Sequence, residues 1–470
     1  MTFSSLVFIC IFLPIVFCLH CVIPSIRVRN ALLIVASLLF YAFGEPVYVL
    51  LMLFSAFLNY SAARLIDAGN RKLFLVLAVA INIGILCVFK YTGFIITSIN
   101  AAFNASIPVP EISLPIGISF FTFQALSYVI DVYRRNVDMQ PNFFKVLLYI
   151  SFFPQLIAGP IVKYRDIANE IDNREVVVSE VAPGLRRFIV GLSKKVLIAN
   201  TMAVVADNIF SKDITEINIV VAWIGALAYV MQIYYDFSGY SDMAIGMGKM
   251  FGFHFKENFD HPYIAENIKD FWRRWHISLS SWFKEYVYIP LGGNRKGELR
   301  TGINKVIVFF LTGLWHGANW TFVAWGLFHG FFSFLEEFVP SIKKLPKVIS
   351  HIYLMIVVTV GFVIFRAETL SYGAGFIGRM FAGFSFGKTY TSLAMQQLTP
   401  WFIVMFVFAV LCSGALNKLT YKIMPKESEC ASSKGRAIEA ALYIIAVILL
   451  AWCIIRLSSG SYNPFIYFRF

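Results

Sequence analysis

The sequence predicts an all-α, polytopic membrane protein, on the strength of its composition, its succession of apolar runs and the basic residues between them. Of the 470 residues, 59% are hydrophobic and 14% are charged, whereas soluble domains carry roughly 25% charged residues. Water could not wet a surface so poor in charge, so lipid must be the solvent. At about 20 residues per span plus loops, this length predicts one bundle of roughly ten to twelve spans.

The apolar runs that would form these spans are spread over the whole chain. They lie near residues 3–23, 31–43, 47–63, 73–90, 112–130, 143–160, 217–235, 306–335, 349–365, 400–417 and 437–457. Several are shorter than the bilayer is thick, which tilt, local thinning or burial among other helices can accommodate. Pro and Gly interrupt the run 143–160, which favours a re-entrant element there. Asn104–Glu111 contains two prolines and is expected to be a loop.

Basic residues between the runs orient both ends of the chain. They stand after the first, third and tenth runs: Arg27, Arg29, Arg64, Arg71, Lys72, Lys418, Lys422, Lys426, Lys434 and Arg436. Cytoplasmic loops carry an excess of Lys and Arg, so these loops are expected in the cytoplasm, and the N-terminus and the C-terminus outside. Topology therefore accounts for the net charge of +13, and no nucleic-acid partner is expected.

The run Val306–Leu335 predicts a pair of short helices. It contains no Asp, Glu, Lys or Arg. One helix of this length would measure about 45 Å, more than the roughly 30 Å hydrocarbon core, whereas two full spans would need about 40 residues. Basic residues flank both ends, so both ends prefer the cytoplasm. We therefore expect two helices that enter and return, with a turn near Gly313–Asn319 that leaves His316 inside the protein.

Two of the seven histidines lie in unusual settings, His276 in the segment Phe271–Ser280 and His316 in the segment Leu314–Trp320. An ionisable residue at membrane depth is costly, which makes it a functional candidate by default. The alternative for each is a neutral imidazole hydrogen-bonded between helices. A neutral imidazole can take a proton from a hydroxyl at neutral pH, as acyl transfer requires. His329, further along the second run, is expected to be structural.

Several other chemistries lack their signatures. The two histidines have no third ligand at helix spacing, and no His-Glu-x-x-His occurs, so no metal site is expected. Cys18-x-x-Cys21 has no second pair, which argues against metal or redox function. No Gly-x-Ser-x-Gly elbow and no Gly-x-x-x-x-Gly-Lys-Ser/Thr loop occurs. A serine-hydrolase mechanism and direct use of ATP are therefore not expected.

Basic residues are dense around the first of these histidines. They are Lys269, Arg273, Arg274, Lys284, Arg295 and Lys296. They are expected to be cytoplasmic topology charge. The functional alternative is that they attract a phosphate-bearing donor to the cytoplasmic mouth of a site.

Five segments share their content and their order with one known family. They are Leu114–Gln124, Tyr235–Asp242, Asn258–Tyr263, Phe271–His276 and Gly313–Ala318. Together they resemble the membrane-bound O-acyltransferase (MBOAT) family in its bacterial branch. That branch includes the membrane subunit of alginate O-acetyltransferase, the peptidoglycan O-acetylation membrane protein and the teichoic-acid D-alanyl transfer protein.

The resemblance implies an MBOAT fold, a ring of roughly 11–12 transmembrane helices around a thin central region with re-entrant helices. The donor would approach from the cytoplasm and the acceptor from outside. The transmembrane core would cover residues 1–436. His316 would correspond to the near-invariant histidine that acts as the base, and His276 to a second, more variable position.

Further candidate site residues lie near these histidines. Arg273 and Arg274 would belong to the substrate-binding residues, together with Trp315 and Asn319. The Trp315 indole N–H or His276 would support the developing oxyanion.

The C-terminus, Asn463–Phe470, resembles the Phe-Ile-Tyr-x-x-Phe ending of small partner peptides of the D-alanylation system, which is fused to some O-acetylation MBOATs. The resemblance implies that Tyr467 is a transient acyl acceptor. Residues 437–470 would then form a final transmembrane helix and an extracytoplasmic acyl-acceptor motif. The alternative is an aromatic anchor at the membrane interface.

The expected function is transmembrane O-acyl transfer, in the form of O-acetyl transfer, from a cytoplasmic thioester to a polysaccharide or cell-wall glycan. The implied donor is acetyl-CoA, with no bound cofactor. The implied partner is an extracytoplasmic esterase-like (SGNH) transferase, and the implied location is the bacterial cytoplasmic membrane. The alternatives are D-alanyl transfer to teichoic acid, against which the fused tail weighs, and a proton-coupled transporter whose buried histidines relay protons.

Overall fold

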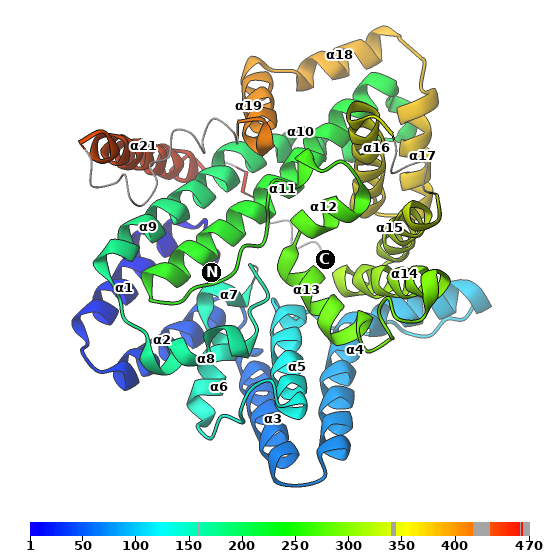
Figure 1. Cartoon of the computed structure of the whole chain (residues 1–470). Coiled ribbons are helices and arrows are strands. Elements are labelled where there is room, and N and C mark those ends of the chain that lie inside the picture. Colours follow the sequence, from blue (N-terminus) through cyan, green and yellow to red (C-terminus); the bar gives the residue numbers. More distant parts are fainter. Residues whose placement is uncertain (158, 340–344, 417–432, 461, 464–470) are drawn as a thin grey trace. The chain divides into compact units, whose positions relative to one another are not determined.

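The computed structural model describes residues 1–157, 159–339, 345–416, 433–460 and 462–463. These residues fold into helices and connecting loops (Figure 1), which confirms the predicted all-α, polytopic class. The chain divides into two compact units. Unit 1 comprises Met1–Phe188, Met243–Glu257 and Lys284–Tyr286, and unit 2 comprises Ile189–Asp242, Asn258–Phe283 and Val287–Phe470.

Unit 1 is built from the N-terminal helices. They are η1 (Phe8–Phe12), α1 (Leu13–Val22), α2 (Ile26–Ala42), α3 (Val49–Ala68), α4 (Arg71–Phe103), α5 (Ile118–Arg134), α6 (Phe143–Ser151), α7 (Phe153–Leu156), α8 (Tyr164–Asn173) and most of α9 (Val178–Ser193). Phenylalanine rings from η1, α2 and α7 form part of its core. The ring centroids of Phe8 and Phe40 are 5.6 Å apart, and those of Phe40 and Phe153 are 5.8 Å apart.

Two sequence predictions fall in unit 1: the loop after Asn104 is confirmed, and the re-entrant element in the run 143–160 stays a prediction. The interrupted run 143–160 contains a break at Phe152, whose backbone (φ −52°, ψ 113°) separates α6 from α7. The segment after Asn104, which ends α4 in a left-handed conformation, is a loop up to the start of α5. In the helical part of the unit, Asn59 of α3 and Asn82 of α4 exchange reciprocal amide hydrogen bonds of 3.1 and 2.9 Å. Such a pair satisfies two polar groups at once and joins the two helices.

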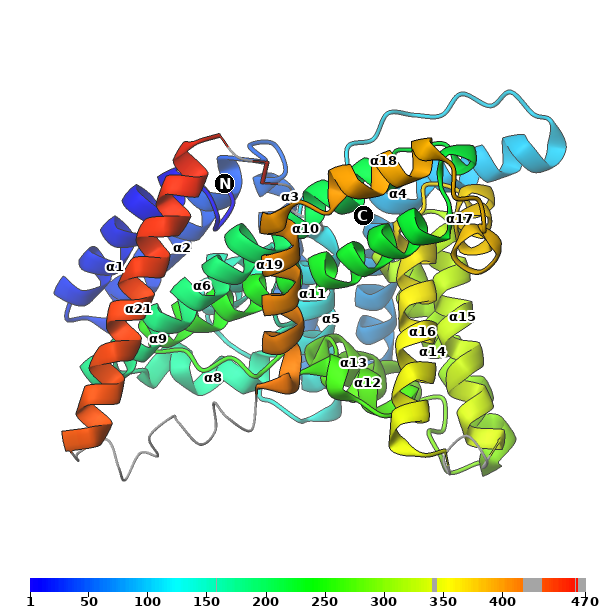
Figure 2. The same cartoon turned by 90° about the horizontal axis from the view of Figure 1, so that it is seen from above.

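Unit 2 contains the remaining helices. They are η2 (Lys194–Ala199), α10 (Asn200–Phe210), η3 (Ile214–Glu216), most of α11 (Ile219–Met250), η4 (Pro262–Ile264), α12 (Ile268–Arg274), α13 (Ile277–Phe283), η5 (Lys284–Tyr288, shared with unit 1), α14 (Gly297–His316), α15 (Trp320–Phe338), α16 (Lys347–Arg366), α17 (Leu370–Ala382), α18 (Lys388–Gln397), α19 (Pro400–Val410), η7 (Leu411–Ala415) and α21 (Ser433–Ser458). In Figure 2, α14, α15 and α16 lie side by side.

The predicted hairpin is confirmed, because α14 and α15 are joined by a turn at Gly317–Asn319. The two helices approach closely where glycines face the partner backbone. A Cβ on Gly313 would lie 2.3 Å from the carbonyl oxygen of Phe322, and a Cβ on Gly326 would lie 2.4 Å from that of Phe309. Only glycine permits such an approach, so these two positions set the spacing of the hairpin.

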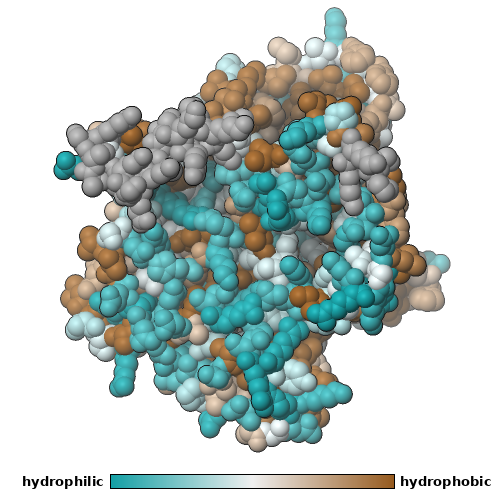
Figure 3. All heavy atoms as spheres, viewed as in Figure 1, coloured by the Kyte–Doolittle hydropathy of each residue, from teal (hydrophilic) through white to brown (hydrophobic). Residues whose placement is uncertain are grey.

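Six helices among the described residues are long and apolar enough to span a membrane, or seven if the bent pair α18–α19 is one span. They confirm a multi-pass membrane protein. Several of the predicted apolar runs form shorter helices, such as Phe8–Val22. Figure 3 shows hydrophobic side chains around α19 and hydrophilic ones over α12 and α13. The spanning segment of α21 buries 11% of its residues, so about half or more of its residues are exposed where lipid can reach them.

Candidate active site

His276 occupies the turn between α12 and α13 in unit 2. Its backbone lies in the left-handed region, with φ of 45°, where histidine is found more often than most other residues. The backbone N–H of Ile277 donates to the carbonyl oxygen of Asn258 over 2.9 Å. This bond ties the turn to the segment after α11. The turn directs the imidazole into the interior, and the residue is 1% exposed.

The side chain of Asn258 fixes the tautomer of His276. Its Oδ1 accepts from the backbone N–H of Ser278 over 3.2 Å and from the Ser278 hydroxyl over 2.8 Å. Its Nδ2 donates to Oγ of Ser241 over 2.9 Å. Since Oδ1 is an acceptor, Nδ1 of His276, 3.1 Å away, must carry a proton and donate it.

The other ring nitrogen of His276 therefore carries a lone pair. This Nε2 is buried and has no hydrogen-bond partner among the described residues. The residue lies outside the candidate spanning helices, and burial lowers the pKa of its imidazole. The neutral form thus prevails at neutral pH, and Nε2 can accept a proton or a hydrogen bond. As a neutral ring it cannot donate from Nε2, so the predicted support of an oxyanion by His276 would need the protonated form.

His316 is the last residue of α14 and is buried at the turn of the hairpin, as the charge pattern predicts. Aromatic rings enclose its imidazole. The ring centroid of Trp315 lies 4.8 Å away, and those of Trp325 and Phe365 lie 5.1 and 5.2 Å away in edge-to-face orientation. Such a surrounding excludes bulk water from the imidazole.

The two candidate histidines lie near each other in unit 2. Trp315 stands between them, with its ring centroid 6.0 Å from that of His276 and 4.8 Å from that of His316. Phe237 of α11 packs edge-on against the other side of His276, with centroids 4.6 Å apart. The site is thus assembled from α11, the α12–α13 turn and the α14–α15 hairpin.

A third buried histidine extends this arrangement. The ring of His329 in α15 lies 5.2 Å from that of Trp325 and 5.0 Å from that of Trp272 in α12. Both of its ring nitrogens are buried without a hydrogen-bond partner among the described residues. The sequence interpretation of His329 as structural therefore has no hydrogen bond between helices to support it. An unsatisfied buried polar atom is destabilising by roughly 1–3 kcal/mol, so packing alone is a poor reason for histidine here.

The short helix α12 is held in position by a carboxylate of α15. Glu336, 5% exposed, accepts hydrogen bonds from the backbone N–H groups of Ile268 over 2.9 Å and of Lys269 over 3.4 Å. A negative charge at a helix N-terminus satisfies otherwise unpaired N–H groups. Sequence reasoning missed Glu336, because a lone acidic residue at the end of an apolar run gives no signal of its partner.

The predicted substrate-binding arginines lie at the end of α12 and pair with acidic neighbours. Arg273 contacts Asp270 over 2.5 Å. Arg274 contacts the other oxygen of Asp270 over 3.0 Å and Asp260 over 3.2 Å. The Arg273 side chain is 73% exposed, whereas that of Arg274 is 21% exposed. Arg273 is therefore the one of the two that can reach a soluble ligand without leaving a buried position.

The two other predicted substrate-binding residues differ in setting. Trp315 is buried between the two histidine rings. Asn319 caps α15, since its Oδ1 accepts from the N–H of Thr321 over 3.2 Å and its Nδ2 donates to the carbonyl oxygen of Glu368 over 3.0 Å. Asn319 therefore has a structural role in fixing the hairpin turn. Tyr467, the predicted acyl acceptor, lies outside the described residues.

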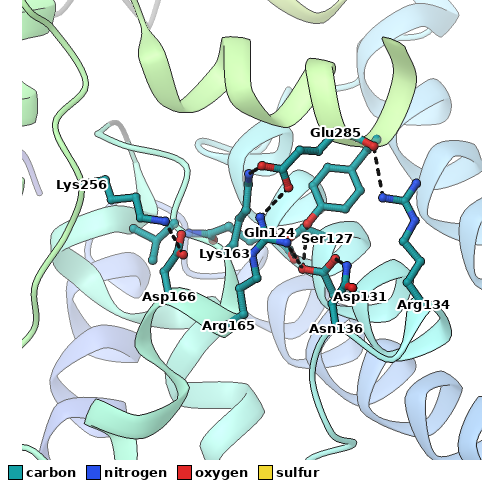
Figure 4. Close-up of polar contacts among 12 residues, drawn as sticks. Gln124, Ser127, Asp131, Arg134, Asn136, Lys163, Arg165, Asp166, Lys256 and Glu285 are labelled. Atoms are coloured by element: carbon teal, nitrogen blue, oxygen red, sulfur yellow. Dashed lines mark hydrogen bonds and ion pairs between the residues drawn. The ribbon is translucent and has the colours of Figure 1, made fainter. Parts of the chain in front are cut away.

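A second polar cluster lies in unit 1 (Figure 4). Glu285 in η5 contacts Lys163 over 2.7 Å and Arg165 over 2.5 Å, both from the start of α8. Tyr286 donates to Asp131 of α5 over 2.8 Å. Burial opposes ionisation of Glu285, but the two cations nevertheless hold the pKa of its carboxyl below the usual value. These contacts join η5 to α5 and α8, so we interpret the cluster as structural.

The arrangement in unit 2 can accept a proton in a water-poor aromatic pocket. Within the described ranges, no three His, Cys, Asp or Glu side chains are grouped for metal binding. Asn258 is the residue that gives His276 its chemistry, and it stands in one of the five segments singled out above. The pairing spans α12, so no local sequence pattern could have predicted it.

Comparison with known proteins identifies similar chains. The model of the family described as MBOAT, membrane-bound O-acyltransferase family, matches residues 46–367. The protein named Probable alginate O-acetylase AlgI from Pseudomonas putida is 39% identical over 495 residues, which cover 100% of both chains. The Peptidoglycan O-acetyltransferase of Helicobacter pylori is 38% identical over 409 residues, 78% of this chain and 77% of its own. The Teichoic acid D-alanyltransferase of Bacillus subtilis is 29% identical over 306 residues, 59% of this chain and 76% of its own.

Proposed function

The chain belongs to the membrane-bound O-acyltransferase family, in the branch of the alginate O-acetylase and the peptidoglycan O-acetyltransferase, and from this premise we propose that it moves an acetyl group from cytoplasmic acetyl-CoA to the outer face of the membrane. The final recipient is a polysaccharide or cell-wall glycan. The protein works in the bacterial cytoplasmic membrane, with both termini outside. Residues 1–436 are the catalytic core and residues 437–470 present the acyl-acceptor motif.

One observation carries this proposal. Two buried imidazoles, His276 and His316, flank Trp315 in a pocket of aromatic rings, with centroid distances of 6.0 and 4.8 Å. Buried, uncharged imidazoles are the groups that activate a hydroxyl towards a thioester. We assign the base to His316. We assign to His276 a positioning role, in which its ring, held by Asn258, packs against Trp315 beside His316.

The transfer balances without a further reactant. The Tyr467 oxygen forms a bond to the thioester carbonyl carbon while its proton moves to the imidazole of His316. The tetrahedral intermediate then breaks its C–S bond, and the imidazolium returns the proton to the leaving thiolate. Tyrosine has an ordinary pKa near 10, so it needs such a base to react at neutral pH.

The acyl-tyrosine then donates its group outside the cell. An extracytoplasmic esterase-like transferase of the SGNH type takes the acetyl group and passes it to the glycan. The relatives' names support acetylation of alginate or peptidoglycan. The weaker similarity to a D-alanyltransferase supports the second candidate, in which the donor is a D-alanyl thioester on a carrier protein. A transporter would instead move ions or solutes in liposomes without any acyl chemistry.

The test uses the full chain in lipid nanodiscs with isotopically labelled acetyl-CoA. Mass spectrometry is expected to find the labelled acetyl group on Tyr467. When a D-alanyl carrier thioester replaces acetyl-CoA as the donor, no D-alanyl group is expected on Tyr467. His316→Ala is expected to slow labelling by about 10² or more, and His276→Ala less. His254→Gln is the matched control, because this histidine is half exposed and pairs with Glu170 in unit 1.

Two outcomes would overturn the proposal. Full-rate labelling by a correctly inserted His316→Ala protein would show that His316 is not the base. Absence of label on Tyr467, together with normal glycan acetylation in cells that carry Tyr467→Phe, would show that acyl-tyrosine is not an intermediate.

A further inference from the structure

Four polar ring atoms of unit 2 are buried and have no hydrogen-bond partner in the part of the chain that the structure describes. They are Nε1 of Trp272 in α12, Nε1 of Trp325 in α15 and both ring nitrogens of His329 in α15. Trp325 and His329 are each 1% exposed. Buried polar groups are nearly always paired, so four such atoms in neighbouring rings indicate a ligand group that pairs with them.

The three rings form one compact group, which we call the donor cluster. The ring centroid of His329 lies 5.0 Å from that of Trp272 and 5.2 Å from that of Trp325. The centroids of the two indoles are 5.6 Å apart. All three pairs meet edge to face, which is a favourable arrangement of aromatic rings. A single small group placed among the rings could therefore contact all of them.

The donor cluster carries more hydrogen-bond donors than acceptors. An indole nitrogen can only donate, and a neutral imidazole carries one donor and one acceptor. The four atoms without a partner are therefore three N–H donors and one acceptor. Donors in excess inside a water-poor site suit an oxygen on which negative charge develops, because such hydrogen bonds strengthen with the charge of the acceptor.

Trp325 connects the donor cluster to the proposed base. Its ring centroid lies 5.1 Å from that of His316 and 5.2 Å from that of His329. A hydroxyl that gives its proton to His316 lies about 3 Å from the imidazole, and the carbonyl carbon that it attacks lies about 3 Å further on. The oxygen of that carbonyl can therefore come within hydrogen-bond reach of the Trp325 indole.

Two neighbouring contacts hold the donor cluster in place before a substrate binds. Glu336 of α15 accepts from the backbone N–H of Ile268 over 2.9 Å, and this fixes Trp272, which stands one helical turn further along α12. Gly361 of α16 lies against His329, and a Cβ on this glycine would overlap Nε2 of the imidazole. In Figure 1 and in Figure 2, α12 lies beside α16. Donors that are fixed in advance need no reorganisation during the reaction.

We propose that the donor cluster is the oxyanion site of the acyl transfer, and that the indole N–H of Trp325 donates to the thioester oxygen. As the Tyr467 oxygen bonds to the carbonyl carbon and its proton moves to His316, the carbonyl oxygen becomes negative, and the cluster stabilises this charge. The carbonyl reforms when the C–S bond breaks, and no bond within the cluster changes. The inference rests on the proposed function, and it moves the oxyanion role from Trp315 or His276, where the sequence predicted it, to α12 and α15.

The test removes the Trp325 N–H while keeping the shape of the side chain. Benzothienylalanine, an unnatural amino acid with sulfur in place of the indole N–H, replaces Trp325 in the full chain in nanodiscs. Formation of acyl-Tyr467 from labelled acetyl-CoA and release of free CoA are both measured. The maximal rate constant of each is expected to fall by about 10²-fold. The acetyl-CoA concentration at half of this rate is expected to stay unchanged, because the donor acts in the transition state.

The matched control is the same replacement at Trp223, whose indole N–H donates to the carbonyl oxygen of Met380 over 2.8 Å. Loss of that bond is expected to lower the thermal unfolding temperature and to leave the rate constant unchanged. His329→Leu is the second variant, and it removes both ring nitrogens at similar volume. Its rate constant is expected to fall by about tenfold. Its unfolding temperature is expected not to fall, because the variant buries fewer polar atoms without a partner.

Three outcomes separate this inference from the proposed function. Full-rate labelling of Tyr467 with benzothienylalanine at position 325 would overturn the inference and leave the proposed function standing. A slower rate together with a lower unfolding temperature in both the Trp325 and the His329 variants would also overturn it, since both residues would then serve packing. If wild type released CoA without labelling Tyr467, and the Trp325 replacement slowed that release, the oxyanion site would stand and the acyl-tyrosine would fail.

Discussion

The chemistry of His276 depends on one amide. Oδ1 of Asn258 accepts hydrogen bonds from Nδ1–H of His276 and from the Ser278 hydroxyl. A single side chain therefore orients the imidazole and fixes its tautomer. Left-handed backbone at a residue other than glycine is destabilising by roughly 1 kcal/mol or more. The hydrogen bonds around Asn258 are strong enough to keep it, which is the behaviour expected of a residue held for function.

Asn258→Ala tests this dependence at the residue scale. The variant removes the acceptor of Nδ1–H and frees the ring to rotate or to change tautomer. We expect the maximal rate constant for acyl-Tyr467 formation to fall by about tenfold, equal to about 1.4 kcal/mol of barrier. The acetyl-CoA concentration that gives half of this rate is expected to change little.

The control is Ser241→Ala, which removes only the partner of the Asn258 Nδ2 and is expected to retain most of the rate. A larger effect from Ser241→Ala than from Asn258→Ala would contradict the assignment of the amide as the group that orients His276.

Glu285 predicts a pH dependence of stability in unit 1. Lys163 and Arg165 keep the pKa of its carboxyl below the value of 4.5 expected in the unfolded chain. The stabilisation is therefore fully present above pH 4.5, and it is lost as the pH falls through the lower pKa of the folded state. We expect the thermal unfolding temperature to decline below pH 4.5, and Glu285→Gln to be less stable at pH 6 but to decline less steeply. If the unfolding temperatures of the two proteins declined in parallel with falling pH, the Glu285 carboxylate would not be the source of the pH-dependent stabilisation.

At the scale of elements, the α14–α15 hairpin carries both His316 and the acidic cap of α12. Its spacing is set by glycines, because a Cβ on Gly326 would lie 2.4 Å from a backbone oxygen that cannot rotate away. Widening the hairpin would move His316 and the Glu336 cap together. The element therefore couples the geometry of both histidines to the packing of two helices.

Gly326→Ala is expected to lower stability by roughly 1–3 kcal/mol, because overpacking forces the helices apart. Gly378→Ala in α17 is the matched control. A Cβ on Gly378 meets nothing within 4 Å, and Ala is favoured over Gly in a helix by about 1 kcal/mol. Thermal unfolding in nanodiscs is expected to rank the proteins as Gly378→Ala, wild type and Gly326→Ala, from most to least stable. Equal stabilities of the two variants would mean that the hairpin tolerates a wider spacing.

At the scale of the whole molecule, composition and charge were enough to predict the class of fold. The hairpin could also be predicted, because span length and basic flanks leave one economical solution for Val306–Leu335. The residues that hold His276 and α12 in position could not be predicted from the sequence. Asn258 and Glu336 meet their targets through tertiary packing, and neither stands at a helical spacing from the residue that it serves. The missing hydrogen-bond partner of His329 among the described residues is likewise visible only in the folded chain.

Orientation in the membrane is predicted from basic residues and can be measured directly. Ser459 is exposed beyond the end of α21. We expect Ser459→Cys, as the single cysteine of a chain whose native cysteines are replaced, to react with a membrane-impermeant maleimide added to intact cells. Native Cys430, in the basic connection before α21, is expected to react only after permeabilisation. The reverse pattern would place the tail in the cytoplasm and would exclude its role as an extracytoplasmic acyl carrier.

The small buried share of α21 has a consequence for how the protein can be divided. Its spanning segment buries 11% of its residues, and two contacts to neighbouring helices are described. Cys453 contacts Ser193 over 3.6 Å, and the ring of Trp452 lies 5.7 Å from that of Trp401. Cutting the chain before Ser433 would therefore expose little new apolar surface beyond what lipid already covers. A polypeptide ending at residue 432 should therefore insert and fold without the segment that starts at residue 433, and the two should associate only weakly in the bilayer when they are made separately.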